Sequence, residues 1–136
     1  MINLLALLAV NAMLFNIPGE LLVSVCEQES SLQSWKTAFR DGNGRHSHGL
    51  CQVQSRTARG MGFTGVTEDL YDPLVNSFYA AKYLRYQYDR YGSWDDAIAA
   101  YNAGRVKRRD NGEYINQKYV DEVKGRMNGH RPNTTD

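Results

Sequence analysis

Apolar side chains recur at helical spacing in several stretches of the chain, and local signals mark where each helix begins or ends. The first stretch has no charged residue and gathers larger apolar side chains on one face: Leu4, Leu7, Leu8 and Phe15. A second helix is predicted from Pro18, because proline lacks the N–H that the first turn of a helix leaves unbonded anyway. The N-terminal part of the chain is therefore expected to form two helices.

Two further helices are predicted from start and stop signals in the middle of the chain. Asp72-Pro73 begins a long helix and Gly92 ends it, because glycine readily adopts the left-handed conformation of a helix end. Ser93 caps the next helix, and Gly104 ends it. The side chains expected to be buried are Leu74, Phe78, Ala81, Leu84 or Arg85, and Tyr88 in the long helix, and Ala97, Ile98 and Tyr101 beside Trp94 in the next.

The remaining segments complete a mainly α-helical prediction. Residues 36–65 are rich in glycine, which predicts loops, short turns and a small ribbon able to line a cleft. A turn at Asn111-Gly112 precedes a last helix, expected to run through Tyr114, Val120 and Val123. We expect one helical domain over residues 1–128 and a flexible tail over residues 129–136.

The apolar residues 1–15 allow two interpretations. They are expected to form an extra N-terminal helix of the domain; the alternative is a signal segment, but the basic residues that open such segments are missing. They fall short of the roughly 20 apolar residues that a transmembrane helix needs. No stable membrane insertion is expected.

Charge narrows the classes of partner. The 136 residues include 16 Lys and Arg against 15 Asp and Glu, a net charge of +1, so nucleic acid is not an expected partner. A basic run at residues 105–109 is either a solvated surface or a feature that attracts an anionic partner.

Two cysteines leave three interpretations open. Cys26 and Cys51 can form one disulfide, which their spacing does not decide. Together with His46 and His48 they can be arranged as zinc ligands, although this spacing is a weak signature and no metal is expected. A nucleophilic pair of Cys51 and His48 lacks a third residue to orient it.

Glu29 is the first candidate for chemistry. On the second helix it shares a face with Leu22, Val25 and Cys26, so it should be partly desolvated, whereas Glu27 points the other way. Desolvation raises the pKa of a carboxyl group, as a general acid at neutral pH requires. The alternative is a glutamate that bends out to water.

Tyr101 is the second candidate, since its spacing from Trp94 and Ile98 places it on a buried face. A buried hydroxyl needs a hydrogen-bond partner. The spacing leaves two open: a buried carboxyl group or a backbone carbonyl.

Five short motifs occur in an order that resembles a known family. They are Gln28-Glu29-Ser30, Ser47-His48-Gly49-Leu50-Cys51-Gln52, Asp72-Pro73 with Asn76, Ala100-Tyr101-Asn102-Ala103-Gly104, and Tyr119-Val120. Over residues 16–127 the chain resembles the lysozyme-like soluble lytic transglycosylase domain. The stretch Arg40-Asp41-Gly42 resembles the corresponding stretch of the small transglycosylases of secretion and conjugation systems. Phage enzymes have similar short domains.

The resemblance implies a lysozyme-like α+β fold and cleavage of the β-1,4 bond between N-acetylmuramic acid and N-acetylglucosamine in peptidoglycan, without a cofactor. Glu29 matches the only catalytic carboxyl group, which acts as acid and then as base while a 1,6-anhydro ring closes. Tyr101 matches a tyrosine that hydrogen-bonds this glutamate. The matching substrate-binding positions are Ser30, Ser47, Gly49, Gln52, Asn102 and Tyr119. The family usually has Met where this chain has Cys51. This smaller side chain is expected to affect the affinity for the saccharide more than the activity.

The implied partners are peptidoglycan glycan strands, together with a secretion system, a virion or a holin that brings the enzyme to the cell wall or periplasm. The export route stays open. Two alternatives to a transglycosylase remain: a hydrolytic muramidase of the goose lysozyme type, which needs a second carboxylate, and a non-catalytic wall-binding module.

Overall fold

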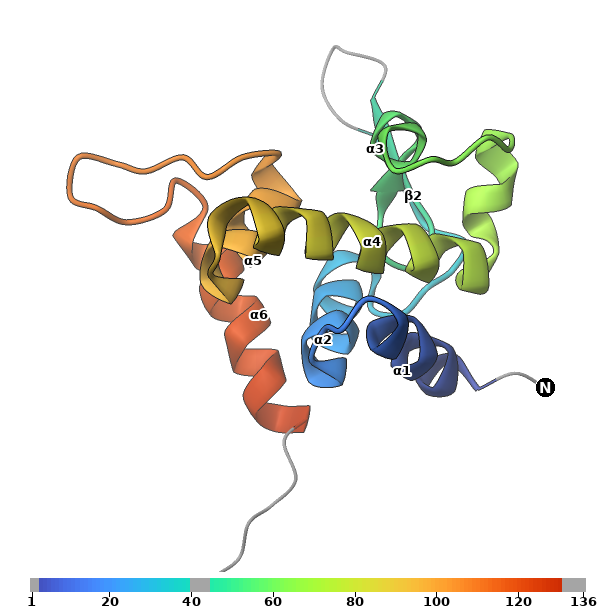
Figure 1. The fold of residues 1–136 in the computed structure, drawn as a ribbon, viewed down its shortest axis with the longest axis horizontal. Helices are drawn as coiled ribbons and strands as arrows, with labels where there is room; N and C mark the ends of the chain where they lie inside the picture. Colours follow the sequence, from blue (N-terminus) through green and yellow to red (C-terminus); the bar gives the residue numbers. More distant parts are fainter. Residues whose placement is uncertain (1–2, 40–44, 131–136) are drawn as a thin grey trace, which may run out of the picture.

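The computed structural model describes residues 3–39 and 45–130, and within them the chain is mainly helical, as predicted (Figure 1). The elements in chain order are α1 (Leu4–Leu14), α2 (Gly19–Ser30), β1 (Thr37–Phe39), β2 (His46–His48), β3 (Val53–Gln54), α3 (Ser55–Gly60), the 3-10 helix η1 (Thr67–Tyr71), α4 (Pro73–Tyr91), α5 (Trp94–Ala103) and α6 (Gln117–His130). None of the described helices is both long and apolar enough to cross a membrane.

The predicted helix ends are confirmed for α4 and α5. The Asp72 side chain accepts a hydrogen bond from the backbone N–H of Leu74, and Ser93 accepts one from Asp96. Gly92 and Gly104 end the two helices with φ values of 76° and 86°. Pro18 precedes the first residue of α2 instead of lying inside its first turn.

The buried face of α4 was only partly predicted. Ala81 and Leu84 are buried as expected, but Leu74 is 48% exposed. The buried face instead carries polar residues such as Ser77, whose hydroxyl accepts a 2.7 Å hydrogen bond from the side chain of Asn11 on α1. Polar side chains can occupy a core when they are paired, so apolar periodicity misplaced this face.

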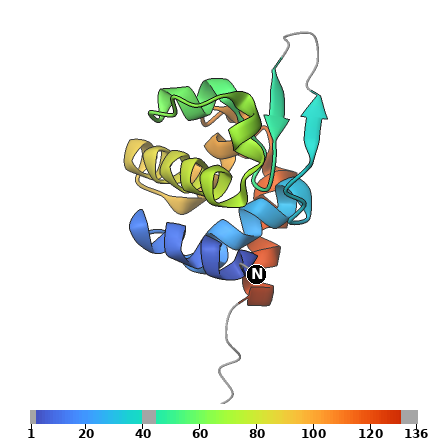
Figure 2. The ribbon, with the colours of Figure 1, turned by 90° about the vertical axis from the view of Figure 1, so that its right-hand side faces the viewer.

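The three strands form a small antiparallel sheet in the order β1-β2-β3, which confirms the predicted ribbon. The opposed arrows of β1 and β2 are visible in Figure 2. Ala38 faces Ser47, and Ser47 in turn faces Gln54. The helical segments α3 and η1 in and after this glycine-rich region were not predicted. The Arg40-Asp41-Gly42 motif lies outside the described residues.

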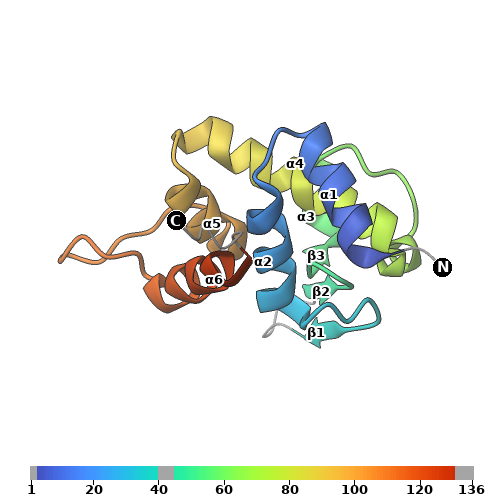
Figure 3. The same ribbon diagram turned by 90° about the horizontal axis from the view of Figure 1, so that it is seen from below.

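Helix α2 lies at the centre, with α1 and the sheet on one side and α5 and α6 on the other (Figure 3). Its buried Leu21, Leu22 and Val25 belong to one core with Leu84 of α4 and Ile98 of α5. The expected N-terminal helix is present as α1, which packs on α2 and α4 with Leu8 buried.

Cys26 and Cys51 form a disulfide that joins α2 to the turn before β3. The pairing decides among the three interpretations of these cysteines, because a disulfide sulfur is neither a thiolate ligand nor a nucleophile. No group of three metal-ligating side chains occurs within the described ranges.

The last helix begins later than predicted. Tyr114 lies before α6, paired in a β-bridge with Arg108, and its hydroxyl donates a hydrogen bond to Asp96. This pairing draws Tyr114 out of the helical register that its spacing suggested. At the other end, α6 includes Gly129 and His130, which were expected in the tail; residues 131–136 lie outside the described part of the chain.

Candidate active site

A hollow of about 170 Å³ opens between the small sheet and the C-terminal end of α5. The residues that line it come from α2, the sheet region, α3, α4 and α5: Glu29, Arg45, Ser47, Gln52, Val53, Gln54, Thr57, Tyr83, Tyr101, Asn102, Ala103 and Gly104. Five of the predicted site residues, Glu29, Ser47, Gln52, Tyr101 and Asn102, lie together in this wall. Glu29 is the one carboxylate among these described lining residues.

Glu29 is half-buried near the C-terminal end of α2, as its helical spacing predicted. The preceding residues on its face, Val25 and Cys26, are completely buried, so the helix itself aims Glu29 at the hollow. Glu27 lies on another side of the helix and contacts His130 of α6. The two glutamates thus lie on different sides of the helix, as predicted, but Glu27 is partly buried against α6 and does not point freely outward.

Tyr119 of α6 holds the carboxylate of Glu29. Its hydroxyl donates a 2.7 Å hydrogen bond to Oε2 of Glu29, although the two residues are 90 positions apart in the sequence. A phenol that donates to a carboxylate stabilises its charged form and fixes its orientation. Tyr119 was predicted as a cleft residue that binds substrate; the structure places it directly on the glutamate.

Tyr101 has a different partner from the one that the resemblance implied. Its buried hydroxyl donates a 2.7 Å hydrogen bond to the backbone carbonyl of Cys51, the second of the two partners that its spacing left open. Burial, and then the negative charge of Glu29, raise the pKa of Tyr101 well above its ordinary value. Tyr101 therefore stays neutral beside Glu29 and anchors the turn that carries Gln52.

Gln52 offers an unused acceptor at the hollow. Its backbone has a φ of 53°, and its side-chain Nε2 donates to the carbonyls of Gly49, at 2.9 Å, and Lys36, at 3.0 Å. The side-chain Oε1 is buried and has no hydrogen-bond partner among the described residues. A buried oxygen without a partner is costly, so a ligand that donates to it would be favoured.

Asn102 is fixed by a second asparagine. Its Oδ1 accepts a 2.8 Å hydrogen bond from Asn116, which also donates to the carbonyl of Ala99 at 3.0 Å. The Asn102 side-chain orientation is thus set by the segment that leads into α6.

Two further residues expected to bind substrate make contacts within the fold. Ser30 is 1% exposed and its hydroxyl donates to the carbonyl of Leu50 at 2.5 Å, so it ties α2 to the turn. Gly49 is buried with a φ of 76°, and a Cβ there would lie 2.5 Å from the carbonyl oxygen of Leu70 and 2.6 Å from Nδ2 of Asn76. Neither residue lines the hollow.

Sequence reasoning missed Tyr83 of α4, which lines the hollow with its ring 5.5 Å from that of Tyr101. Burial is the main cause that raises the pKa of its phenol. A signal was available, because Tyr83 lies three residues after the buried Ala80 and so on nearly the same side of the helix.

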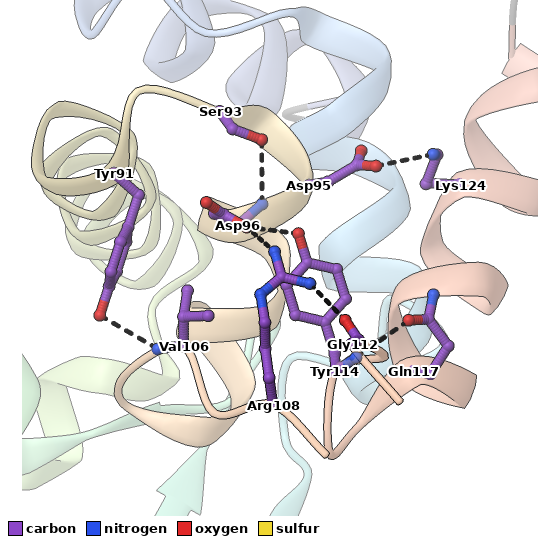
Figure 4. Close-up of polar contacts among 10 residues, drawn as sticks. All are labelled: Tyr91, Ser93, Asp95, Asp96, Val106, Arg108, Gly112, Tyr114, Gln117 and Lys124. Atoms are coloured by element: carbon purple, nitrogen blue, oxygen red, sulfur yellow. Dashed lines mark hydrogen bonds and ion pairs between the residues drawn. The ribbon is translucent and has the colours of Figure 1, made fainter. Parts of the chain in front are cut away.

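The segment from Gly104 to α6 is a hairpin that projects from the molecule (Figure 1) and is held by polar contacts with α5 and α6 (Figure 4). Asp96 of α5 accepts a hydrogen bond from the Tyr114 hydroxyl and forms a 3.2 Å ion pair with Arg108, whose guanidinium lies 4.3 Å from the centre of the Tyr114 ring. These contacts fix the chain just before Asn116 and Tyr119. In this way they help to position Tyr119, which bonds Glu29, and Asn116, which bonds Asn102.

The sequence profile of the family described as Transglycosylase SLT domain matches residues 7–123. The chain belongs to this family. The matched SLT domain includes the five predicted residues that line the hollow and also Tyr119.

Named relatives and solved structures agree with this assignment. IpgF of Shigella sonnei is 29% identical over 97 residues, which are 70% of this chain and 63% of IpgF. The invasion protein IagB of Salmonella typhimurium is 32% identical over 114 residues, or 81% of this chain and 68% of IagB. The chain therefore spans about two thirds of these relatives.

The fold matches that of the lytic transglycosylase Slt from Pseudomonas aeruginosa with a TM-score of 0.72. The match covers 90% of this chain and 23% of Slt, at 24% sequence identity. The SLT domain thus has the lysozyme-like fold that the motifs implied.

The site geometry suits acid–base chemistry at a polar ligand. The half-buried carboxyl group of Glu29 can carry or release one proton, and Tyr119 can follow that change by donating to the charged form. Around it, Gln52 and Asn102 present amide groups whose positions are fixed by other hydrogen bonds. Such preset polar groups fix the orientation of a bound ligand.

Proposed function

We propose that this SLT domain is a peptidoglycan lytic transglycosylase. It cleaves the β-1,4 bond between N-acetylmuramic acid and N-acetylglucosamine and leaves 1,6-anhydromuramoyl ends, with Glu29 as the acid and then the base. The observation that carries the proposal is that Glu29 is the one carboxylate among the described residues that line the hollow.

A single carboxylate in the hollow favours attack by the substrate's own 6-hydroxyl group over attack by water. Glycosidases that use two carboxylates hold them roughly 5 to 9.5 Å apart across the scissile bond. The sequence offers five aspartates as candidates for a second carboxylate, and the four described ones are engaged elsewhere: Asp69 accepts a hydrogen bond from the backbone N–H of Val66, Asp72 caps α4, and Asp95 and Asp96 contact Lys124 and Arg108. A goose-type muramidase would need one of them in the hollow; Asp41, the remaining candidate, lies outside the described residues.

The proposed reaction moves one proton in each direction. Protonated Glu29 gives its proton to the glycosidic oxygen as the bond from C1 of the muramoyl residue to that oxygen breaks. The resulting carboxylate then takes the proton of the muramoyl 6-hydroxyl as its oxygen bonds to C1. The ring closes without consuming water, and Glu29 ends protonated as it began.

The neighbouring residues divide the remaining tasks. Tyr119 stabilises and orients the carboxylate form of Glu29 through its 2.7 Å hydrogen bond. Gln52 accepts a hydrogen bond from the sugar at its unpaired Oε1, Ser47 contributes a polar contact from β2, and Asn102 contributes one from the end of α5. Tyr101 acts through Cys51, by fixing the turn that presents Gln52.

We also propose that the domain works in the cell wall or periplasm, where its substrate lies. The Cys26–Cys51 disulfide supports this location, since disulfides persist in oxidising compartments and are rare in the cytosol. A secretion system, a virion or a holin would bring it there. Thiol alkylation of the chain recovered from its host tests the location: protected cysteines are expected, and freely alkylated ones would contradict it.

Mass spectrometry of the soluble muropeptides released from purified peptidoglycan tests the activity. Wild-type protein is expected to release anhydromuramoyl products, and Glu29→Gln none. Muramoyl products with reducing ends would make the protein a hydrolase. Binding to the wall without any release would make it a non-catalytic module.

A further inference from the structure

Helix α6 packs on α2 and carries the tyrosine that holds Glu29 (Figure 3). The buried residues of α6 are Val120 and Val123, and apolar burial is non-directional, so it does not fix how far the helix slides along α2. A slide of about 1.5 Å, the rise of one residue, exceeds the roughly 0.5 Å over which the lengths of O–H···O hydrogen bonds vary. The 2.7 Å bond from Tyr119 to Glu29 therefore needs a directional contact that sets the register of the two helices.

Gln28, the residue before Glu29 on α2, supplies such contacts with α6. Its side-chain Nε2 donates a hydrogen bond to the carboxylate of Glu122, and its Oε1 accepts one of 2.8 Å from Nε of Arg126. Both partners are charged, and hydrogen bonds to charged groups are shorter and stronger than neutral ones. One side chain of α2 is thus attached to two successive turns of α6.

The two partners of Gln28 lie on the same side of α6 as Tyr119. Glu122 follows Tyr119 by three positions and Arg126 follows it by seven, and residues at this spacing share one face of a helix. On α2, Gln28 and Glu29 are direct neighbours. The bonds of Gln28 and the bond of Glu29 to Tyr119 therefore join the same two faces.

Other polar contacts of α6 act farther from Tyr119 or on another helix. Glu27 contacts His130, which lies 11 positions beyond Tyr119, or about 16 Å along the helix. Lys124 pairs with Asp95 at 2.9 Å, but this ion pair joins α6 to α5 and is exposed on both sides. Neither contact sets the register of α2 and α6 at the site.

An amide group suits this place because its two ends differ. Its NH₂ group can only donate, as a carboxylate requires, and its oxygen can only accept, as a guanidinium requires. A glutamate at position 28 would face Glu122 with a like charge, and a lysine would face Arg126 with one. Gln28 therefore has one favourable orientation, with each end at its own residue of α6.

We infer that Gln28 is a positioning residue of the reaction: it sets the register of α6 on α2 and thereby holds the Tyr119 hydroxyl on Glu29. The inference rests on the proposed function. Gln28 is not among the described residues that line the hollow, so it acts on the substrate through Tyr119 and Glu29. The motif that contains Glu29 thus also contains the attachment for the partner of Glu29, which is 90 positions away.

The test is a double-mutant cycle on kcat, measured with isolated glycan strands. Gln28→Met keeps the length of the side chain and removes both hydrogen bonds. Its kcat is expected to fall about five-fold at unchanged KM, because partly exposed hydrogen bonds are individually modest. Gln28→Met/Tyr119→Phe should have the same kcat as Tyr119→Phe alone, because the hydrogen bond that Gln28 positions is then already absent.

Further variants check the folding of α6 and the specificity of the effect. Glu122 and Arg126 stand four positions apart and can pair with each other once Gln28 is replaced, so α6 should remain helical by circular dichroism. Arg126→Met removes one of the two bonds from the other helix, and it takes the place of Gln28→Met in the cycle if that variant does not fold. Lys118→Gln removes an exposed 3.8 Å ion pair with Glu122 and should keep the wild-type kcat.

Four results on active protein would overturn the inference. They are an unchanged kcat in Gln28→Met, and a loss that multiplies with the loss of Tyr119→Phe in the double variant. A rise in KM would place Gln28 on the substrate instead. An equal loss of kcat in Lys118→Gln would reduce the effect to the charge of α6.

Absence of cleavage by wild-type protein would overturn the proposed function, and NMR then tests the position of Tyr119 by itself. Tyrosine is labelled with carbon-13 at Cζ, and the Tyr119 signal is the one missing in Tyr119→Phe. Glu29→Gln should shift this signal because it removes the charged acceptor, and Gln28→Met should shift it in the same direction. A signal that Gln28→Met leaves in place would overturn the inference.

Discussion

The hydroxyl of Tyr119 lies 2.7 Å from Oε2 of Glu29 and connects α6 to α2 across 90 positions of sequence. Tyr119→Phe removes this donor and keeps the ring. A lost hydrogen bond to a charged group corresponds to about 1.5–3 kcal/mol, so kcat should fall roughly ten- to hundred-fold while KM changes little. Steady-state kinetics on isolated glycan strands measures the split; a rise in KM at constant kcat would instead make Tyr119 a substrate-binding residue.

Tyr101→Phe should act through stability. The substitution leaves the carbonyl of Cys51 without its buried donor, which costs about 1–3 kcal/mol in the free energy of unfolding. Urea denaturation is the measurement. Full stability with a loss of kcat as large as that of Tyr119→Phe would show that Tyr101 takes part in the reaction directly.

Glu29→Gln keeps the shape of the side chain and removes its titrating proton. Cleavage should fall at least about 100-fold, since that is the typical contribution of a positioned acid or base, and the thermal unfolding midpoint should stay close to wild type. The matched control is Glu27→Gln, on another side of the same helix. Glu27 contacts His130 and does not line the hollow, so this variant should retain activity. A large loss of cleavage in the control would contradict the assignment of the two helix faces.

Glu29 was predictable and its partner was not, for a physical reason. The orientation of Glu29 follows from the 3.6-residue period of one helix, which the residues Leu22, Val25 and Cys26 reveal locally. The contact with Tyr119 depends on how α6 packs on α2, and no spacing within either helix contains that information. The motif resemblance brought both tyrosines to the site, but it assigned the hydrogen bond with Glu29 to Tyr101, whereas Tyr119 makes it.

The fold was predictable where helix ends carry their own chemistry. Asp72, Ser93, Gly92 and Gly104 act within one helical turn, and all four predictions are confirmed. The buried face of α4 depends instead on distant partners, such as Asn11 for Ser77. Its polar residues therefore looked like surface residues in the sequence.

Gly49→Ala should destabilise the protein by more than the strain of its φ of 76°. The new methyl group would lie 2.5 Å from the carbonyl oxygen of Leu70, a backbone atom that cannot move aside cheaply. Gly92→Ala is the matched control, with the same φ of 76° and no neighbour within 4 Å of the added methyl. We expect about 1–2 kcal/mol for the control and a larger loss for Gly49→Ala. Equal losses in urea denaturation would show that φ alone matters at Gly49.

Removal of the disulfide should lower stability and activity together. Cys26→Ala/Cys51→Ala frees a loop with a sequence separation of 25, for which chain-entropy arguments give about 3 kcal/mol. The turn that carries Gln52 would also lose its tie to α2, so kcat/KM should decrease. Wild-type protein under reducing conditions should have the same lowered thermal unfolding midpoint as the double variant. An unchanged midpoint in both would show that the disulfide does not stabilise the fold.

Tyr114 should make stability depend on alkaline pH. Burial, followed by its hydrogen bond to Asp96, raises the pKa of Tyr114 to about 12 (Figure 4). In the unfolded chain the phenol ionises near its ordinary pKa of about 10. The folded state therefore holds the proton longer, so this stabilisation is complete below about pH 10 and is lost as the pH rises toward about 12, by up to about 1.4 kcal/mol per pH unit.

Tyr114→Phe provides the comparison, because it lacks the titrating hydroxyl and keeps the ring under Arg108. The free energy of unfolding, measured by urea denaturation from about pH 9 to about pH 11.5, should fall more steeply in wild-type protein than in the variant. Parallel curves would mean that the Tyr114 proton is not held by Asp96 in the folded state. The hairpin that positions Asn116 and Tyr119 would then depend on the Arg108–Asp96 ion pair.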